Sequence, residues 1–388
     1  MRYKTIFFTV VFLFAIYACF NSNALAVPID IHFVYTNGAD ASSQKDKEFF
    51  INGINKAHKN FKYSFESNPL IKKNVLKNGT IPVSSTAEPF YWGTDSQDAF
   101  AHLNDKLITL KTLSPKIAQG IRAFIAKLLH DAIWVQKQYN MQKIIFNLHK
   151  QIKCDEKNGH KVVLFGYSAG SFITYRYLFQ KLPAIEPEKI VKALEVDYDG
   201  NIDSFYRENI PNATCVDALS ASNIAMYSDD GYLVYFKDSK QLKNNYRNLN
   251  KFTNQVCTSS DELLGVVNYG SPIALFYSDI LEPKHDVNKY NADLYKYIKD
   301  NDMFFLTVNF NDDPLGFPLG KNLTISEIEG KYNINFDKNG RGVFYSKSNF
   351  RSPATFLGAH ISYWKYSKKV AKAIEQAYEE GYTNFYGK

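Results

Sequence analysis

The sequence has few of the features that mark metal-binding, membrane-spanning or nucleic-acid-binding proteins. Only four of its 388 residues are cysteines, no Cys or His pair has the spacing of a zinc site, and no His-Glu-x-x-His motif occurs. After the N-terminal region, no apolar run approaches the roughly 20 residues that a membrane-spanning helix needs. The formal net charge is +7, but the lysines are scattered rather than gathered into a basic arm. We therefore expect no metal, no cofactor and no nucleic acid.

The N-terminal stretch has the pattern of a secretory signal peptide. Two basic residues precede an apolar run over residues 6–20, and Ala24-Leu25-Ala26 supplies a small-x-small cleavage site. This predicts a signal peptide over residues 1–26 and a secreted or periplasmic protein. Two alternatives stay open: an uncleaved signal anchor, and a lipid anchor in the cell envelope through Cys19, which ends a segment that resembles a bacterial lipobox.

The rest of the chain is rich in apolar residues, which make up 45% of the sequence, with 15% aromatic. That is enough for one large core, so we expect a single domain over residues 27–388 with insertions. A dispersed positive charge is ordinary for a soluble surface, and mild attraction to an anionic membrane surface is the alternative.

The most informative stretch is Gly166-Tyr167-Ser168-Ala169-Gly170, which matches the G-x-S-x-G nucleophile elbow. An elbow needs a strand before it and a helix after it, with glycines that let the two backbones approach. Residues 161–165 read as a buried strand, and residues 171–180 have helical spacing. A chance pentapeptide is the alternative, but it would seldom lie between two such elements. Ser168 is therefore the candidate nucleophile.

An early strand over residues 29–35 ends in a turn that contains Asn37, Gly38 and Ala39. Hydrolases with such an elbow take one oxyanion donor from the residue after the nucleophile and another from a loop after an early strand. These donors correspond to the backbone N–H of Ala169 and to those of Gly38 and Ala39. The alternative is that Asn-Gly forms only a tight turn.

Between this turn and the elbow, the pattern is mostly helical. Residues 45–59 have helical character, residues 60–89 are poorly periodic, and residues 90–93 close a strand in which Trp92 is a core residue. Residues 96–152 have apolar side chains at three- and four-residue steps, including Ile133 and Trp134. We expect helices that pack on the sheet, with contact to lipid as the alternative.

The segment 197–261 is polar and interrupted, with short strand-like pieces such as residues 231–236. It predicts an insertion that forms a cap or lid over the site; a surface excursion is the alternative. Cleavage after Ala26 leaves Cys154, Cys215 and Cys257, an odd number. In an oxidising compartment we expect a Cys215–Cys257 disulfide, with Cys154 free.

A serine nucleophile needs an imidazole base and a carboxylate that orients it, in the chain order Ser, acid, His. The strand-like run 303–310 ends at Asp312 and Asp313, where the acid belongs. Only His285 and His360 follow Ser168, and chain order selects His360 because it comes after the acid. A short strand over residues 342–345 and a loop over residues 351–359 lead to His360, and an amphipathic helix follows it.

These residues resemble lipase-type α/β hydrolases, and the class-three, fungal-type lipases in particular. The likeness rests on the elbow, on the strand and turn 266–272, on the Asn-Asp-Asp-Pro turn 311–314, and on His360 followed by Tyr363-Trp364. It covers roughly residues 160–180 and 263–366. The resemblance implies an α/β-hydrolase fold, with a mostly parallel central sheet, helices on both faces and a cap. It also implies Ser168 as nucleophile, Asp313 as acid, with Asp312 as the alternative, and His360 as base.

The expected function is therefore a secreted serine hydrolase that cleaves carboxylic esters through an acyl-enzyme. Its partner would be an ester or lipid substrate, and the aromatic content and the expected lid favour apolar acyl groups. Two alternatives are an acyltransferase with the same triad and a catalytically inactive, hydrolase-like envelope protein that binds a partner.

Overall fold

The structure is a computed structural model that describes residues 26–39, 44–92, 159–179, 224–227, 233–236, 263–274, 287–317, 323–332, 339–352 and 357–387, with further single positions between 130 and 152 and between 319 and 336. Five sequence predictions lie wholly or mostly outside these residues: the signal peptide with Cys19, the helical pattern before residue 130, the Cys215–Cys257 disulfide with Cys154, His285, and most of the segment 197–261. Within the described residues, no helix has the length and apolar character of a membrane span.

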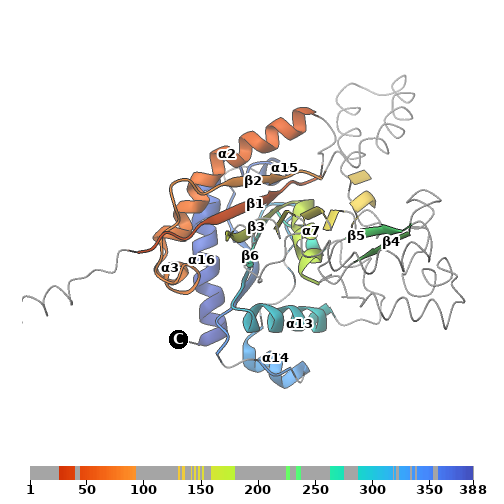
Figure 1. The fold of residues 1–388 in the computed structure, drawn as a ribbon. Helices are drawn as coiled ribbons and strands as arrows, with labels where there is room; N and C mark the ends of the chain where they lie inside the picture. The colour runs from red at the N-terminus through yellow and green to blue at the C-terminus, as the bar shows by residue number, and fades with distance from the viewer. Residues whose placement is uncertain are drawn as a thin grey trace, which may run out of the picture.

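The centre of the protein is a parallel sheet of six strands in the order β2-β1-β3-β6-β7-β8 (Figure 1). Every neighbouring pair of strands in this sheet is parallel. All the strands therefore end at the same edge, where the loops that follow them come together. The strands are β1 (Ile31–Thr36), β2 (Ala87–Phe90), β3 (Lys161–Tyr167), β6 (Leu263–Tyr269), β7 (Phe304–Phe310) and β8 (Val343–Phe350).

The strands are apolar on both sides because helices cover both faces of the sheet. In β3, Val162 and Leu164 belong to the core on one face, and Val163 and Phe165 belong to the core on the other. A strand buried on both faces has a nearly continuous apolar sequence rather than an alternating one. This is why the sequence marks β3, β6 and β7 so clearly.

The helices divide into two layers (Figure 1). One face is covered by α2 (Gln44–Ser67), α3 (Pro69–Asn74) and α16 (Ser367–Tyr386). The other is covered by α7 (Ala169–Phe179), α13 (Val287–Asp300) and helical residues between 130 and 152. Two shorter helices are α14 (Ile325–Tyr332) and α15 (Leu357–His360). The architecture is a three-layer α/β arrangement, in agreement with the expected parallel sheet with helices on both faces.

Three local expectations are wrong. The first helix does not end near residue 59 but continues to Ser67, and α3 follows within the segment that reads as irregular. Asn68 caps α3, since its Oδ1 accepts hydrogen bonds from two backbone amides and proline occupies the first helical position. Ile133 does not pack on the sheet, since its side chain is 59% exposed. His360 ends the short helix α15 rather than following a loop.

A separate two-stranded antiparallel sheet lies within the segment 197–261. Its strands are β4 (Ile224–Tyr227) and β5 (Leu233–Phe236), and the second coincides with most of the strand-like piece seen in the sequence. In the order of the chain, this small sheet lies between α7 and β6 and is not part of the parallel sheet.

Candidate active site

Ser168 lies at the turn between β3 and α7 and has a φ angle of 51°. This left-handed conformation is strained for a residue with a side chain, and such strain is typical of functional turns. The turn also depends on its glycines. A Cβ on Gly170 would lie 2.4 Å from the Thr36 carbonyl oxygen, and one on Gly166 would lie 2.6 Å from the Cα of Ser171. The strand, the helix and the loop after β1 therefore meet closely around Ser168.

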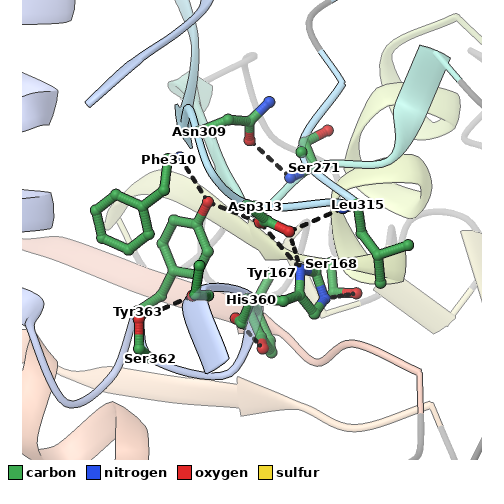
Figure 2. A network of polar contacts seen from close by, with 12 residues as sticks. Tyr167, Ser168, Ser271, Asn309, Phe310, Asp313, Leu315, His360, Ser362 and Tyr363 are labelled. Atoms are coloured by element: carbon green, nitrogen blue, oxygen red, sulfur yellow. Dashed lines mark hydrogen bonds and ion pairs between the residues drawn. The ribbon is translucent and has the colours of Figure 1, made fainter. Parts of the chain in front are cut away.

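Figure 2 shows Ser168, His360 and Asp313 joined in a row. The Oγ of Ser168 lies 2.9 Å from Nε2 of His360, and Nδ1 of His360 lies 3.0 Å from both carboxylate oxygens of Asp313. All three residues are buried. Because Asp313 faces Nδ1, that nitrogen carries the proton, and Nε2 is left to accept the serine hydroxyl proton.

The structure places Asp313, and not Asp312, beside His360. Oδ1 of Asp313 also accepts a hydrogen bond of 2.9 Å from the backbone amide of Leu315, which fixes the carboxylate in its turn. Asp312 points elsewhere, because its Oδ1 accepts a hydrogen bond of 3.1 Å from the amide of Ser352. The two neighbouring aspartates thus have separate tasks: one faces the imidazole and the other holds the loop after β8.

Two tyrosines hold the base and the acid in place, and sequence reasoning assigned a role to neither (Figure 2). The hydroxyl of Tyr167 donates a 2.8 Å hydrogen bond to the His360 carbonyl, and its ring stacks on the imidazole at 5.6 Å. The hydroxyl of Tyr363 donates to Oδ2 of Asp313 at 2.9 Å and accepts from the amide of Phe310 at 2.8 Å. Burial, and then the charge of Asp313, raise the pKa of Tyr363 well above its usual value, which keeps this hydroxyl protonated.

A buried polar network lies behind the nucleophile and links the ends of three strands. The Ser171 hydroxyl donates a 2.6 Å hydrogen bond to the Ser168 carbonyl and lies 2.8 Å from the Ser271 hydroxyl. The backbone amide of Ser271 donates to Oδ1 of Asn309 at 2.8 Å. The turn that carries Ser168 is therefore tied to the loop after β6 and to β7, which leads to Asp313. Nothing in the sequence spacing pointed to these contacts.

The loop after β1, for which the sequence predicts oxyanion donors, lies close to Ser168. A Cβ on Gly38 would lie 2.8 Å from Cβ of Ser168, so only glycine fits without displacement. Ala169 is the first residue of α7, and the first amides of a helix have no partner within it. The backbone of Gly38, with Ala39 after it, and the amide of Ala169 thus flank the serine.

A group of metal-ligand types lies outside this site. Potential ligand atoms of Asp30, His32 and His160, at the amino end of the sheet, all lie within 4.8 Å of one another. The two imidazoles are stacked, with ring centres 3.9 Å apart and planes only 16° from parallel. A metal ion lies in the plane of each imidazole that binds it, so both rings cannot hold one ion in this arrangement. Instead, Nδ1 of His160 lies 2.7 Å from a carboxylate oxygen of Asp30, and Nδ1 of His32 lies 2.8 Å from a carboxylate oxygen of Glu88.

Comparisons of the chain with protein-family models, with curated proteins and with solved structures gave no match. The chemistry open to the site follows from its own geometry. It presents a buried serine hydroxyl to an imidazole, with the carboxylate of Asp313 on the far side of the ring. Such a row can move a proton from the hydroxyl to Nε2 while the serine oxygen forms a bond.

Proposed function

We propose that this protein is a serine hydrolase that cleaves carboxylic esters through an acyl-enzyme. The observation that carries the proposal is the 2.9 Å contact between Ser168 Oγ and His360 Nε2, with Asp313 on the opposite nitrogen. The parallel sheet and the strained turn after β3 support an α/β-hydrolase fold, in which the segment 197–261 would form the cap.

In this proposal, Ser168 Oγ attacks the ester carbonyl carbon while its proton passes to Nε2 of His360. The carbonyl oxygen becomes an oxyanion, which the backbone amides of Ala169 and of Gly38 or Ala39 stabilise. The C–O bond of the ester then breaks, and the alcohol leaves with the proton from His360. A water molecule, deprotonated by His360, then attacks the acyl carbon. The bond to Ser168 Oγ breaks, the serine takes the proton back from His360, and the carboxylic acid leaves. Asp313 keeps the imidazole in the required tautomer and stabilises its charged form.

Apolar surface beside the site supports an apolar acyl substrate. Ile361, directly after His360, is 58% exposed, and Phe317, on the loop after Asp313, is 38% exposed. Exposed large apolar side chains beside a site contact an apolar ligand or a lipid surface more favourably than water. Export through the predicted signal peptide belongs to the same proposal.

The test is covalent labelling of the full chain with a fluorophosphonate, followed by peptide mass spectrometry. We expect one adduct on Ser168, no labelling of Ser168→Ala, and normal labelling of Ser326→Ala, which alters an exposed serine in α14. Lack of an adduct in folded wild-type protein would contradict the mechanism. A series of p-nitrophenyl esters of increasing chain length, with and without an added alcohol, then shows acyl preference and separates hydrolysis from acyl transfer.

A further inference from the structure

The loop that carries the proposed oxyanion donors is held by two buried residues that follow different strands, Asn37 after β1 and Trp92 after β2. We infer that Asn37 and Trp92 are positioning residues, which aim the backbone amides of Gly38 and Ala39 at the oxyanion formed on Ser168. This inference rests on the proposed function and adds to it a defined way of fixing the donors.

Three hydrogen bonds join the residues of this loop to one another and to Trp92. The indole Nε1 of Trp92 donates to the Asn37 carbonyl at 2.7 Å, and the backbone amide of Trp92 donates to Oδ1 of Asn37 at 3.1 Å. The side-chain amide of Asn37 in turn donates to the Gly38 carbonyl at 2.8 Å. Two successive backbone carbonyls, those of Asn37 and Gly38, therefore have fixed partners.

Fixing these carbonyls fixes the amides that follow them. The C=O and N–H of a trans peptide lie in one plane and point in opposite directions. Since the Asn37 carbonyl faces the indole of Trp92, the Gly38 amide faces away from it. Since the Gly38 carbonyl faces the Asn37 side chain, the Ala39 amide also has a set direction. The two proposed donors are thus oriented through the carbonyls that precede them.

The residues that orient the loop are themselves held firmly. Asn37 and Trp92 are each 2% exposed, and the Trp92 ring stacks on Trp134 with centres 6.1 Å apart. The sequence alone indicates only a core role for Trp92. A buried indole N–H needs an acceptor, and here that acceptor is a backbone carbonyl of the loop beside Ser168. Donors held in place before the reaction stabilise the transition state without reorganising during it.

Two Trp→Phe substitutions in the same stacked pair separate positioning from packing. Trp92→Phe removes the N–H that holds the Asn37 carbonyl, whereas Trp134→Phe alters the stack and leaves that hydrogen bond in place. Asn37→Asp is the second test, because it keeps an acceptor for the Trp92 amide but loses the donor to Gly38. Each variant is first checked for folding by circular dichroism and thermal denaturation.

The measurements are kcat and KM on a p-nitrophenyl ester, and the inhibition constant of a boronic acid, whose tetrahedral serine adduct carries an oxygen in the oxyanion position. For Trp92→Phe we expect kcat/KM to fall about 10-fold to 100-fold, somewhat less than the loss of a whole oxyanion donor. Boronic acid affinity should fall by a similar factor and KM should change little, because the loop contacts the transition state rather than the ground state.

The outcomes distinguish this inference from the proposed function. If folded Trp92→Phe and Asn37→Asp match Trp134→Phe in kcat/KM and in boronic acid affinity, the inference is wrong and the proposed function stands. If both fall only through KM, the residues serve substrate binding and the inference is also wrong. If folded wild-type protein neither reacts with the fluorophosphonate nor turns over esters, both are overturned.

Discussion

The hydroxyl of Tyr363 donates a hydrogen bond to Oδ2 of Asp313, at 2.9 Å, and accepts one from the backbone amide of Phe310. Asp313 therefore has a partner besides His360 that helps keep its carboxylate in place. The ring of Tyr363 also stacks on Phe310, with centres 4.3 Å apart, so the hydroxyl cannot swing away without a loss of packing. The proposed acid is thus held by a side chain that lies three residues after the proposed base.

Tyr363→Phe should weaken both the fold and the activity. It leaves the Phe310 amide without its buried acceptor and removes a donor to a charged group, which costs about 1–3 kcal/mol of stability. We expect kcat to fall about tenfold, the equivalent of about 1.4 kcal/mol. Tyr167→Phe is the matched control, since its hydroxyl donates to the backbone carbonyl of His360, and its effect on kcat should be smaller. Equal effects would show that the contact to Asp313 has no special importance.

The two neighbouring aspartates should respond differently to the same substitution. Asp313→Asn removes the charge beside His360 and lets the imidazole adopt the wrong tautomer, so we expect kcat to fall about 10³-fold to 10⁴-fold. Asp312→Asn keeps an oxygen that accepts from the Ser352 amide, and the rate should stay near that of the wild type. Steady-state kinetics on one ester give kcat for both variants. A larger loss of kcat in Asp312→Asn than in Asp313→Asn would show that Asp312 is the acid.

Gly170→Ala should damage the site, whereas Gly330→Ala should be harmless. A Cβ on Gly170 would lie 2.4 Å and 2.5 Å from the carbonyl oxygens of Thr36 and Asn37, which are backbone atoms and cannot yield locally. The loop after β1 must then move in Gly170→Ala. We therefore expect this variant either to lose fluorophosphonate labelling or to fail to fold. Gly330 lies in α14 with open space around it, and alanine there should add up to about 1 kcal/mol of stability through helix propensity. Chemical denaturation measures the stability of both variants, and fluorophosphonate labelling shows whether the site of Gly170→Ala is damaged.

His58 should make the protein less stable at mildly acidic pH. Burial lowers the pKa of His58 from its usual value of 6.5. A hydrogen bond to the Ser85 carbonyl raises this pKa in part, and the charge of Lys62 lowers it again. Because the unfolded chain binds this proton at a higher pH than the folded protein, stability falls as pH decreases below 6.5. The loss of unfolding free energy from about pH 7.5 to about pH 5 should be smaller in His58→Gln than in wild type. Identical losses would count against this assignment.

The sequence predicted the strands that are buried on both faces, because their sequences are almost continuously apolar. The strand over residues 263–269 coincides with β6, and those at 161–165 and 303–310 match β3 and β7 within two residues. The elbow motif marked Ser168 and chain order selected His360, and the structure brings these two residues together with Asp313. The choice between Asp312 and Asp313 could not be settled from composition or spacing, because it depends on which carboxylate the turn aims at the imidazole.

The sequence did not predict α13, α3 or the contact between Trp92 and Asn37, because none of them has a clear local pattern of apolar residues. α13 buries only one face, through residues such as Leu294 and Ile298, and its remaining residues are mostly polar or tyrosine. α3 is only six residues long, too short for a periodic pattern, and depends on its Asn68 cap. The contact of Trp92 with Asn37 spans 55 residues, and no local pattern reveals such a contact. Positioning contacts of this kind become visible only when strands distant in the chain are paired.

The order of strands has a consequence for how the protein folds. Ser168 follows a strand near the middle of the sheet, but its partners arrive from both sides: the loop after β1 on one, and the segments after β7 and β8 on the other. His360 and Ser168 are 192 residues apart, and contacts between residues so distant in the chain form slowly. The nucleophile is therefore synthesised long before the base exists. The reactivity of Ser168 toward a fluorophosphonate would therefore report the last stage of folding, because it appears only after the final strand has joined the sheet.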